Sequence, residues 1–86
     1  MKIEIMYFGR PSVYLGITSE RIDISDEVCT LSQMLNNLRK RGARWAYELD
    51  GSHVVCTINQ KYVEPSEALK NRDEIAIFSR KSWLTL

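Results

Sequence analysis

The residues of this chain that could do chemistry are few, and their spacing does not form a catalytic site. His53 is the only histidine, and no serine or cysteine is placed to act with it as a nucleophile. The two cysteines, Cys29 and Cys56, lack the C-x-x-C spacing typical of metal and redox sites. We therefore expect no catalytic residue, no metal site and two reduced thiols.

The remaining polar motifs are better explained by structure than by catalysis. The carboxylate pairs Asp26-Glu27 and Asp73-Glu74 stand at the boundaries of expected elements, where such residues form turns and caps. The four glycines are scattered singly, which excludes a glycine-rich phosphate-binding loop. We expect no cofactor to bind directly to this chain.

Composition excludes two classes of partner. The net charge of the 86 residues is +1, whereas proteins that bind nucleic acid usually carry a strong basic excess. The longest apolar run covers residues 75–78, and a membrane span needs about 20 apolar residues. We expect no nucleic acid and no membrane as partners. Residues 1–86 form one domain, and the lack of an apolar leader predicts a cytoplasmic location.

Alternating apolar and polar residues predict strands at 1–8, 20–24, 53–58 and 74–78, with a short strand at 62–63. The segment from Gly9 to Ser12 is expected to end the first strand. A longer loop around Gly16 then joins the first two strands as a hairpin.

After residue 24 the apolar residues no longer alternate but recur with the spacing of a helix. This spacing predicts one amphipathic helix that starts after Thr30, runs through residues 39–41 and is stopped by Gly42. Thr30 and Gln33 have the spacing of a capping box. Residues at positions i, i+3, i+4 and i+7 form its apolar stripe: Leu31, Met34, Leu35 and Leu38. Residues 43–49 are expected to form a short irregular or helical turn, and 66–70 is a loop that could hold one further turn of helix.

Together these elements predict an α+β domain in which a mixed sheet of four to five strands wraps over one main helix. If the first and last strands are neighbours, alternation turns their isoleucines toward the helix and places Phe8 and Phe78 on the opposite face. Exposed aromatic residues on an open sheet indicate a partner-binding surface, which Tyr62 would extend. The alternative is that Phe8 tucks under a loop.

Residues 39–41 and Arg44 form a local basic cluster. Cations are favoured at the C-terminal end of a helix, so a solvated helix end is the preferred interpretation. Contact with an acidic partner or an anion remains the alternative.

Four stretches, "IEIMYFGR", "ARWAYELDG", "TINQKYVEPSEAL" and "NRDEIAIF", resemble in order and spacing the small-subunit family of molybdopterin synthase. The resemblance covers residues 2 to about 79 and implies a ubiquitin-like β-grasp fold, related to the thiamine-pathway sulfur carrier. It also implies a role in molybdenum cofactor biosynthesis. In that family a terminal Gly-Gly is adenylated by an activating enzyme and converted to a thiocarboxylate, and the tail then enters a large subunit. The large subunit and the activating enzyme are the partners that the resemblance implies.

Residues 79–86 form a C-terminal tail that departs from the family pattern. Trp83 and Leu84 stand where the diglycine is expected, and a channel sized for glycine would reject an indole ring. We therefore expect docking to a large subunit or an activating enzyme rather than sulfur carriage. Arg80 and Lys81 would steer the tail toward an acidic or phosphate-bearing pocket. The expected partner-binding residues are Phe8, Tyr62, Phe78, Arg80 and Lys81.

The alternative function is that of a degenerate β-grasp paralogue, a regulatory or scaffold module without catalytic activity. It would use the same aromatic face, with Trp83 and Leu84 as an added anchor, because tryptophan is frequent at interface hot spots. A third possibility is that the tail folds back and Trp83 covers the open face of the sheet.

Overall fold

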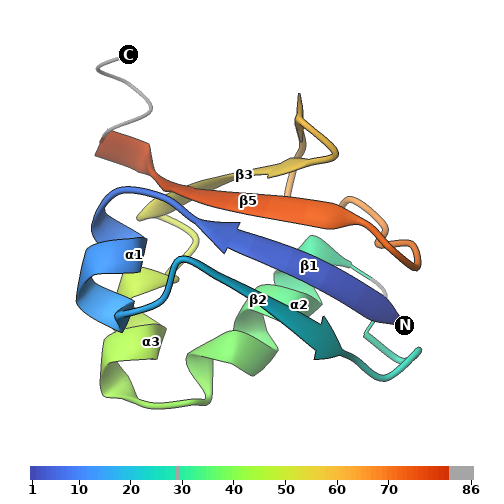
Figure 1. Ribbon diagram of the computed structural model, residues 1–86, viewed down its shortest axis with the longest axis horizontal. Coiled ribbons are helices and arrows are strands. Elements are labelled where there is room, and N and C mark those ends of the chain that lie inside the picture. The colour runs from blue at the N-terminus through green and yellow to red at the C-terminus, as the bar shows by residue number, and fades with distance from the viewer. Residues whose placement is uncertain (29, 82–86) are drawn as a thin grey trace.

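The computed structural model describes residues 1–28 and 30–81, in which a five-stranded mixed sheet packs against a helix layer (Figure 1). The strands are β1 (Lys2–Tyr7), β2 (Ser19–Asp23), β3 (Val54–Ile58), β4 (Lys61–Tyr62) and β5 (Glu74–Ser79). The helices are α1 (Arg10–Leu15), α2 (Leu31–Arg39) and α3 (Ala43–Glu48). The predicted β-grasp architecture is confirmed.

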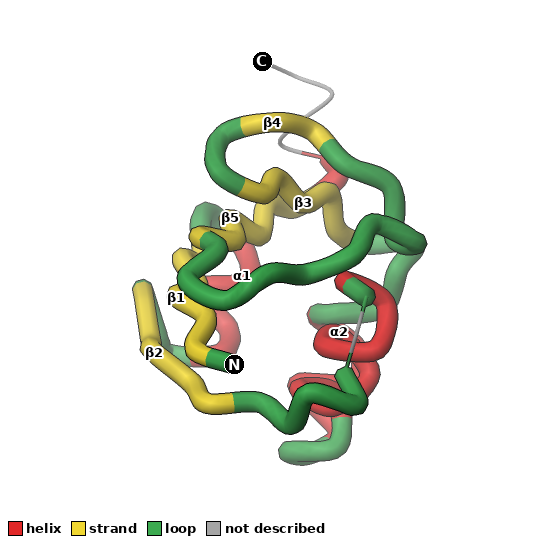
Figure 2. Tube along the Cα trace, turned by 90° about the vertical axis from the view of Figure 1, so that its right-hand side faces the viewer, coloured by secondary structure: helices red, strands yellow, loops and turns green. Residues whose placement is uncertain are grey.

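The first and last strands are neighbours inside the sheet, whose order is β2-β1-β5-β3-β4. The pairing of β1 with β5 is parallel, and the other pairings are antiparallel. Figure 2 shows α2 lying across one face of this sheet. The strand residues predicted to point toward the helix are all buried, with at most 2% of each exposed: Ile3, Ile5, Ile75 and Ile77.

The apolar stripe of α2 supplies the other half of the core. Leu31, Met34, Leu35 and Leu38 are buried and belong to the same cluster as the sheet isoleucines. Burying one such side chain stabilises the fold by about 1.5–3 kcal/mol, so this one contact layer carries much of the stability.

The capping box at the start of α2 is confirmed. The backbone N–H of Gln33 donates to the Thr30 Oγ1 at 3.2 Å, and the Thr30 N–H donates to the Gln33 Oε1 at 3.0 Å. The predicted end of the helix was wrong, because α2 already ends at Arg39 with Lys40 as its C-cap. Gly42 instead precedes α3 as its N-cap, and residues 43–48 are helical.

The segment expected to be a loop between the first two strands contains a helix, α1. Pro11 lies in its first turn, where its missing N–H costs nothing, and Gly16 closes it with a left-handed φ of 68°. Conversely, residues 66–70 form no helix. Ala68 there makes an isolated bridge with Thr30, and Leu69 is buried in the core.

Most of the basic cluster after α2 is exposed, as a solvated helix end would be, but Arg39 and Arg41 also have partners within the molecule. Arg39 donates to the Ala46 carbonyl oxygen at 3.0 Å. Arg41 donates to both carboxylate oxygens of Glu20, at 2.8 and 3.0 Å, and its guanidinium lies 4.6 Å from the centre of the Trp45 ring.

Glu20 is the centre of this network, because the Tyr7 hydroxyl also donates to it at 2.6 Å. Partial burial alone would raise the pKa of Glu20, but the hydrogen bonds from Arg41 and Tyr7 outweigh it, and the net pKa is below its usual value. The network ties β1, β2 and the end of α2 together at one edge of the domain.

Replacing Glu20 tests this network. A lowered folded-state pKa means that the carboxylate stabilises the protein above its unfolded pKa and loses that contribution as pH falls through the folded pKa. Glu20→Gln should therefore lower the free energy of unfolding by about 1 kcal/mol near neutral pH, since solvent screens a partly exposed pair. Urea denaturation should show a smaller deficit at about pH 3. An equal deficit at both pH values, or the same deficit in Glu64→Gln, would contradict this account.

Candidate partner-binding face

The face of the sheet opposite α2, called here the outer face, carries a pair of stacked phenylalanines. The Phe8 N–H donates to the Ile77 carbonyl oxygen at 2.9 Å, which extends the β1–β5 pairing one residue past β1. Phe8 therefore lies beside Phe78, with ring centroids 4.8 Å apart and ring planes only 9° apart. Such a contact adds about 0.5–1.5 kcal/mol beyond the area it buries.

The residue pairing between β5, β3 and β4 shows that the outer face extends to β4. Phe78 lies opposite Val55, and Thr57 lies opposite both Ala76 and Tyr62. Residues directly opposite in a sheet point to the same face, so Tyr62 lies on the outer face with the two phenylalanines. Phe8 is 43% exposed and Tyr62 54% exposed, which rules out the alternative that Phe8 is tucked under a loop.

Two turns set the positions of these aromatic side chains. Gly9, with φ 60° and ψ −133°, reverses the chain directly after Phe8 in a conformation that a residue with a Cβ rarely adopts. Asn59 and Gln60 both have positive φ and form the two-residue turn that brings Tyr62 back beside β3. Asn59 anchors this turn, because its side-chain amide donates to Asp73 at 2.9 Å.

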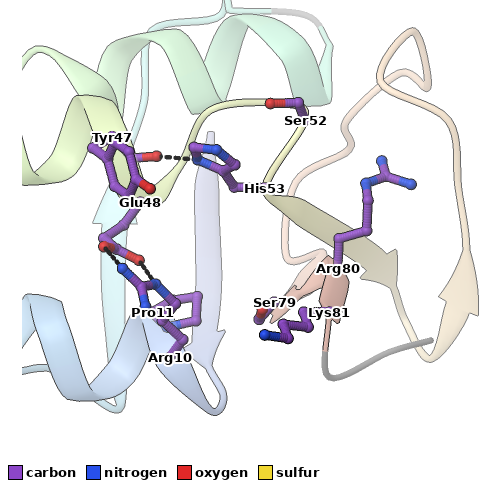
Figure 3. A pocket seen from close by; sticks show the side chains of 9 residues that line it. All are labelled: Arg10, Pro11, Tyr47, Glu48, Ser52, His53, Ser79, Arg80 and Lys81. Atoms are coloured by element: carbon purple, nitrogen blue, oxygen red, sulfur yellow. Dashed lines mark hydrogen bonds and ion pairs between the residues drawn. The ribbon is translucent and has the colours of Figure 1, made fainter. Parts of the chain in front are cut away.

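The other two predicted partner-binding residues lie elsewhere. Arg80 and Lys81 line a cleft at the end of β5, together with Arg10, Glu48 and His53, and Figure 3 shows the lining side chains. No local pattern marks Arg10 and Glu48, which are 38 positions apart and form an ion pair at 3.0 Å. The predicted partner-binding residues thus fall on two surfaces, the aromatic outer face and the basic cleft.

The described residues offer little that could catalyse a reaction. No group of three or more potential metal ligands occurs within residues 1–28 and 30–81. Cys56 lies in the core, where burial raises the pKa of its thiol to about 12, so the thiol stays protonated at neutral pH. The His53 Nδ1 lies 2.7 Å from the Tyr47 carbonyl oxygen.

Some predictions fall on residues that the structure does not describe. Those for Cys29, and for Trp83 and Leu84 in the tail, are of this kind. None of the helices described is long and apolar enough to cross a membrane.

Comparison with known proteins identifies a family whose members are similar to this chain. The model of the ThiS family matches residues 5–79. A curated relative, the molybdopterin synthase sulfur carrier subunit of Haemophilus influenzae, is 28% identical over 76 residues, which are 88% of this chain and 91% of the relative.

Two solved structures share the fold. A protein of Pyrococcus furiosus described as molybdopterin converting factor subunit 1 is 25% identical with a TM-score of 0.77, over 92% of this chain and 97% of that one. A complex of subunits 1 and 2 of the molybdopterin-converting factor of Helicobacter pylori contains a chain that is 15% identical. Its TM-score is 0.64, over 92% of this chain and 93% of that one.

The position of Phe8 on the outer face predicts how much its truncation changes the free energy of unfolding. Phe8→Ala should cost only about 1 kcal/mol in the free energy of unfolding, because it removes a stacking contact from a partly exposed site. Ile5→Ala, in the core, should cost about 2–5 kcal/mol. Urea denaturation of both variants measures the difference, and a Phe8 deficit as large as that of Ile5 would mean that Phe8 is a core residue.

Proposed function

This chain belongs to the ThiS family, and we propose that it acts as the sulfur-carrier-type small subunit of a molybdopterin synthase, docking a large subunit through its outer face. The observation that carries the proposal is the Phe8–Phe78 stack on the sheet face opposite α2. Phe8 and Tyr62 are exposed on this face, and Phe78 is half-buried. The Helicobacter pylori complex supports it, because a protein of the same fold there binds a second subunit.

Exposed aromatic residues on a rigid sheet suit a protein interface. Their rings bury a large area on binding and lose little conformational freedom, since strand pairing already fixes their backbone. The chemistry of the described residues also favours a binding role over a catalytic one, because Cys56 is a protonated thiol in the core rather than a nucleophile. We propose that any activity needs the partner subunit and that no cofactor binds directly to this chain. The curated relative favours this role over that of a scaffold paralogue.

Binding affinity tests the docking surface. Phe78→Ala and Tyr62→Ala should each weaken binding to the large subunit of the same organism by about tenfold or more, as truncation of a hot-spot aromatic does. The matched control is Val13→Ala, which truncates an apolar side chain that is 73% exposed on α1. Isothermal titration calorimetry gives the affinities of the three variants and of the wild type. Equal affinities for all variants and the wild type would show that the outer face does not dock the large subunit.

Sulfur carriage is a separate step that depends on the tail. We propose that the chain docks without carrying sulfur, because Trp83 and Leu84 occupy the positions of the diglycine that its resemblance implies. Incubation with the activating enzyme, ATP and a sulfur source should leave the intact mass unchanged. The control is a chain that carries Trp83→Gly and Leu84→Gly and stops after position 84. It should gain the mass of one oxygen-to-sulfur exchange, and the same gain in the unaltered chain would contradict the proposal.

The activating enzyme as a second partner and the cytoplasmic location are part of the same proposal. Both follow from the role in cofactor biosynthesis that the family resemblance implies.

A further inference from the structure

The cleft at the end of β5 carries an excess of positive charge that docking through the outer face does not use. It has a volume of about 400 Å³ and separates Arg10 and Glu48 from Arg80 and Lys81 (Figure 3). Three cationic side chains and one carboxylate line it, so its local charge is +2 with His53 neutral. The whole chain has a net charge of only +1, so this excess belongs to the cleft rather than to the protein at large.

The single carboxylate of the cleft is already neutralised. Glu48 is 5% exposed, and its two oxygens accept hydrogen bonds from the Arg10 guanidinium at 3.0 and 3.3 Å. Arg10 is further held between aromatic rings, with its guanidinium carbon 4.3 Å from the centre of the Tyr14 ring and 5.9 Å from that of Tyr47. The charge available to a ligand is therefore that of Arg80 and Lys81, both of which are exposed.

The backbone and side chain of Arg80 are positioned before any ligand arrives. The Arg80 N–H donates to the His53 carbonyl oxygen at 2.8 Å, which continues the β3–β5 ladder beyond β5. One guanidinium nitrogen also lies 3.4 Å from the carbonyl oxygens of Gly51 and Val54. A guanidinium has five N–H donors, so others remain for a carboxylate, which arginine binds with two parallel hydrogen bonds. Holding the side chain in place beforehand lowers the entropy lost on binding.

The cleft adjoins the outer face. Arg10 and Arg80 each follow by two residues a member of the aromatic stack, Phe8 and Phe78, so both sites lie at the same end of the β1–β5 pair. A protein bound over the stack would reach the cleft with an adjacent segment. The exposed cations complement an acidic segment of such a protein.

We propose that this cleft binds the carboxylates of an acidic segment of the partner protein. The identity of that partner as the large subunit rests on the proposed function, but the binding of carboxylates by the cleft does not. The stack would then supply apolar affinity, and the cleft would set the orientation of the partner and speed its association.

The free protein tests the cleft alone, with a hexaglutamate peptide as the probe. Saturable NMR shifts are expected at the amides of Ser52, His53 and Lys81. The double variant Arg80→Gln/Lys81→Gln should weaken the binding at least fivefold. The matched control, Lys40→Gln/Lys70→Gln, removes two exposed lysines away from the cleft and should leave it unchanged.

Two results would overturn the proposal. One is equal weakening in the control variant, which would show that only the overall charge matters. The other is inorganic phosphate that binds the cleft more tightly than hexaglutamate does, which would identify a site for a small anion.

The complex with the large subunit separates this inference from the proposed function. The affinity of the Arg80→Gln/Lys81→Gln variant should fall less steeply with salt than that of the wild type, because the variant lacks two exposed charges whose attraction to the partner salt would screen. If hexaglutamate binds as expected but the large subunit does not bind at all, the proposed function fails and the cleft stands. If the large subunit binds with an unchanged salt dependence in the variant, the cleft plays no part and the docking face stands.

Discussion

The parallel pairing of β1 with β5 is the interaction on which the rest of the molecule depends. It places Ile5 beside Ile75 and Tyr7 beside Ile77, and all four side chains are buried on the side of α2. Since successive residues of a strand point to opposite faces, burying this set forces Phe8 and Phe78 outward. A shift of one residue in this register would reverse both faces, so the core itself fixes the position of the aromatic stack.

Local patterns were strong enough to predict part of this structure. The capping box at Thr30 and the apolar stripe of α2 are signals that depend only on neighbouring residues, and both were right. Alternation in β1 and β5 identified the buried isoleucines and the outer phenylalanines. Helix α1 was missed, because the expected hairpin between β1 and β2 led the Pro11 and Gly16 signals to be interpreted as a loop.

The cleft could not be predicted, because its members are brought together only by the fold. Glu48 has the pattern of a solvated helix residue in the sequence, yet it is buried and bound to Arg10, which lies 38 positions earlier in the chain. The same reason explains the basic cluster after α2. Arg41 meets Glu20 across 21 positions, and no local pattern marks that partner. Electrostatic pairs of this kind depend on tertiary contacts and not on periodicity.

The proposed recognition of a partner is thus divided between two neighbouring surfaces of different chemistry. The outer face presents flat apolar rings on a fixed backbone, and the cleft presents two exposed cations held at the end of β5. Neither surface needs a reactive group of its own, which agrees with a protein that works through its partner. The fold provides both at low cost, because the packing that stabilises the core also positions them.

The central claim is that the outer face is the surface that meets the large subunit, and site-specific photocrosslinking tests it most directly. A photoreactive benzoylphenylalanine placed at Tyr62, on the outer face, should crosslink to the large subunit on irradiation of the mixture. The same residue placed at Asn36, exposed on α2 on the other side of the domain, should not. Crosslinking from Asn36 and none from Tyr62 would contradict the account.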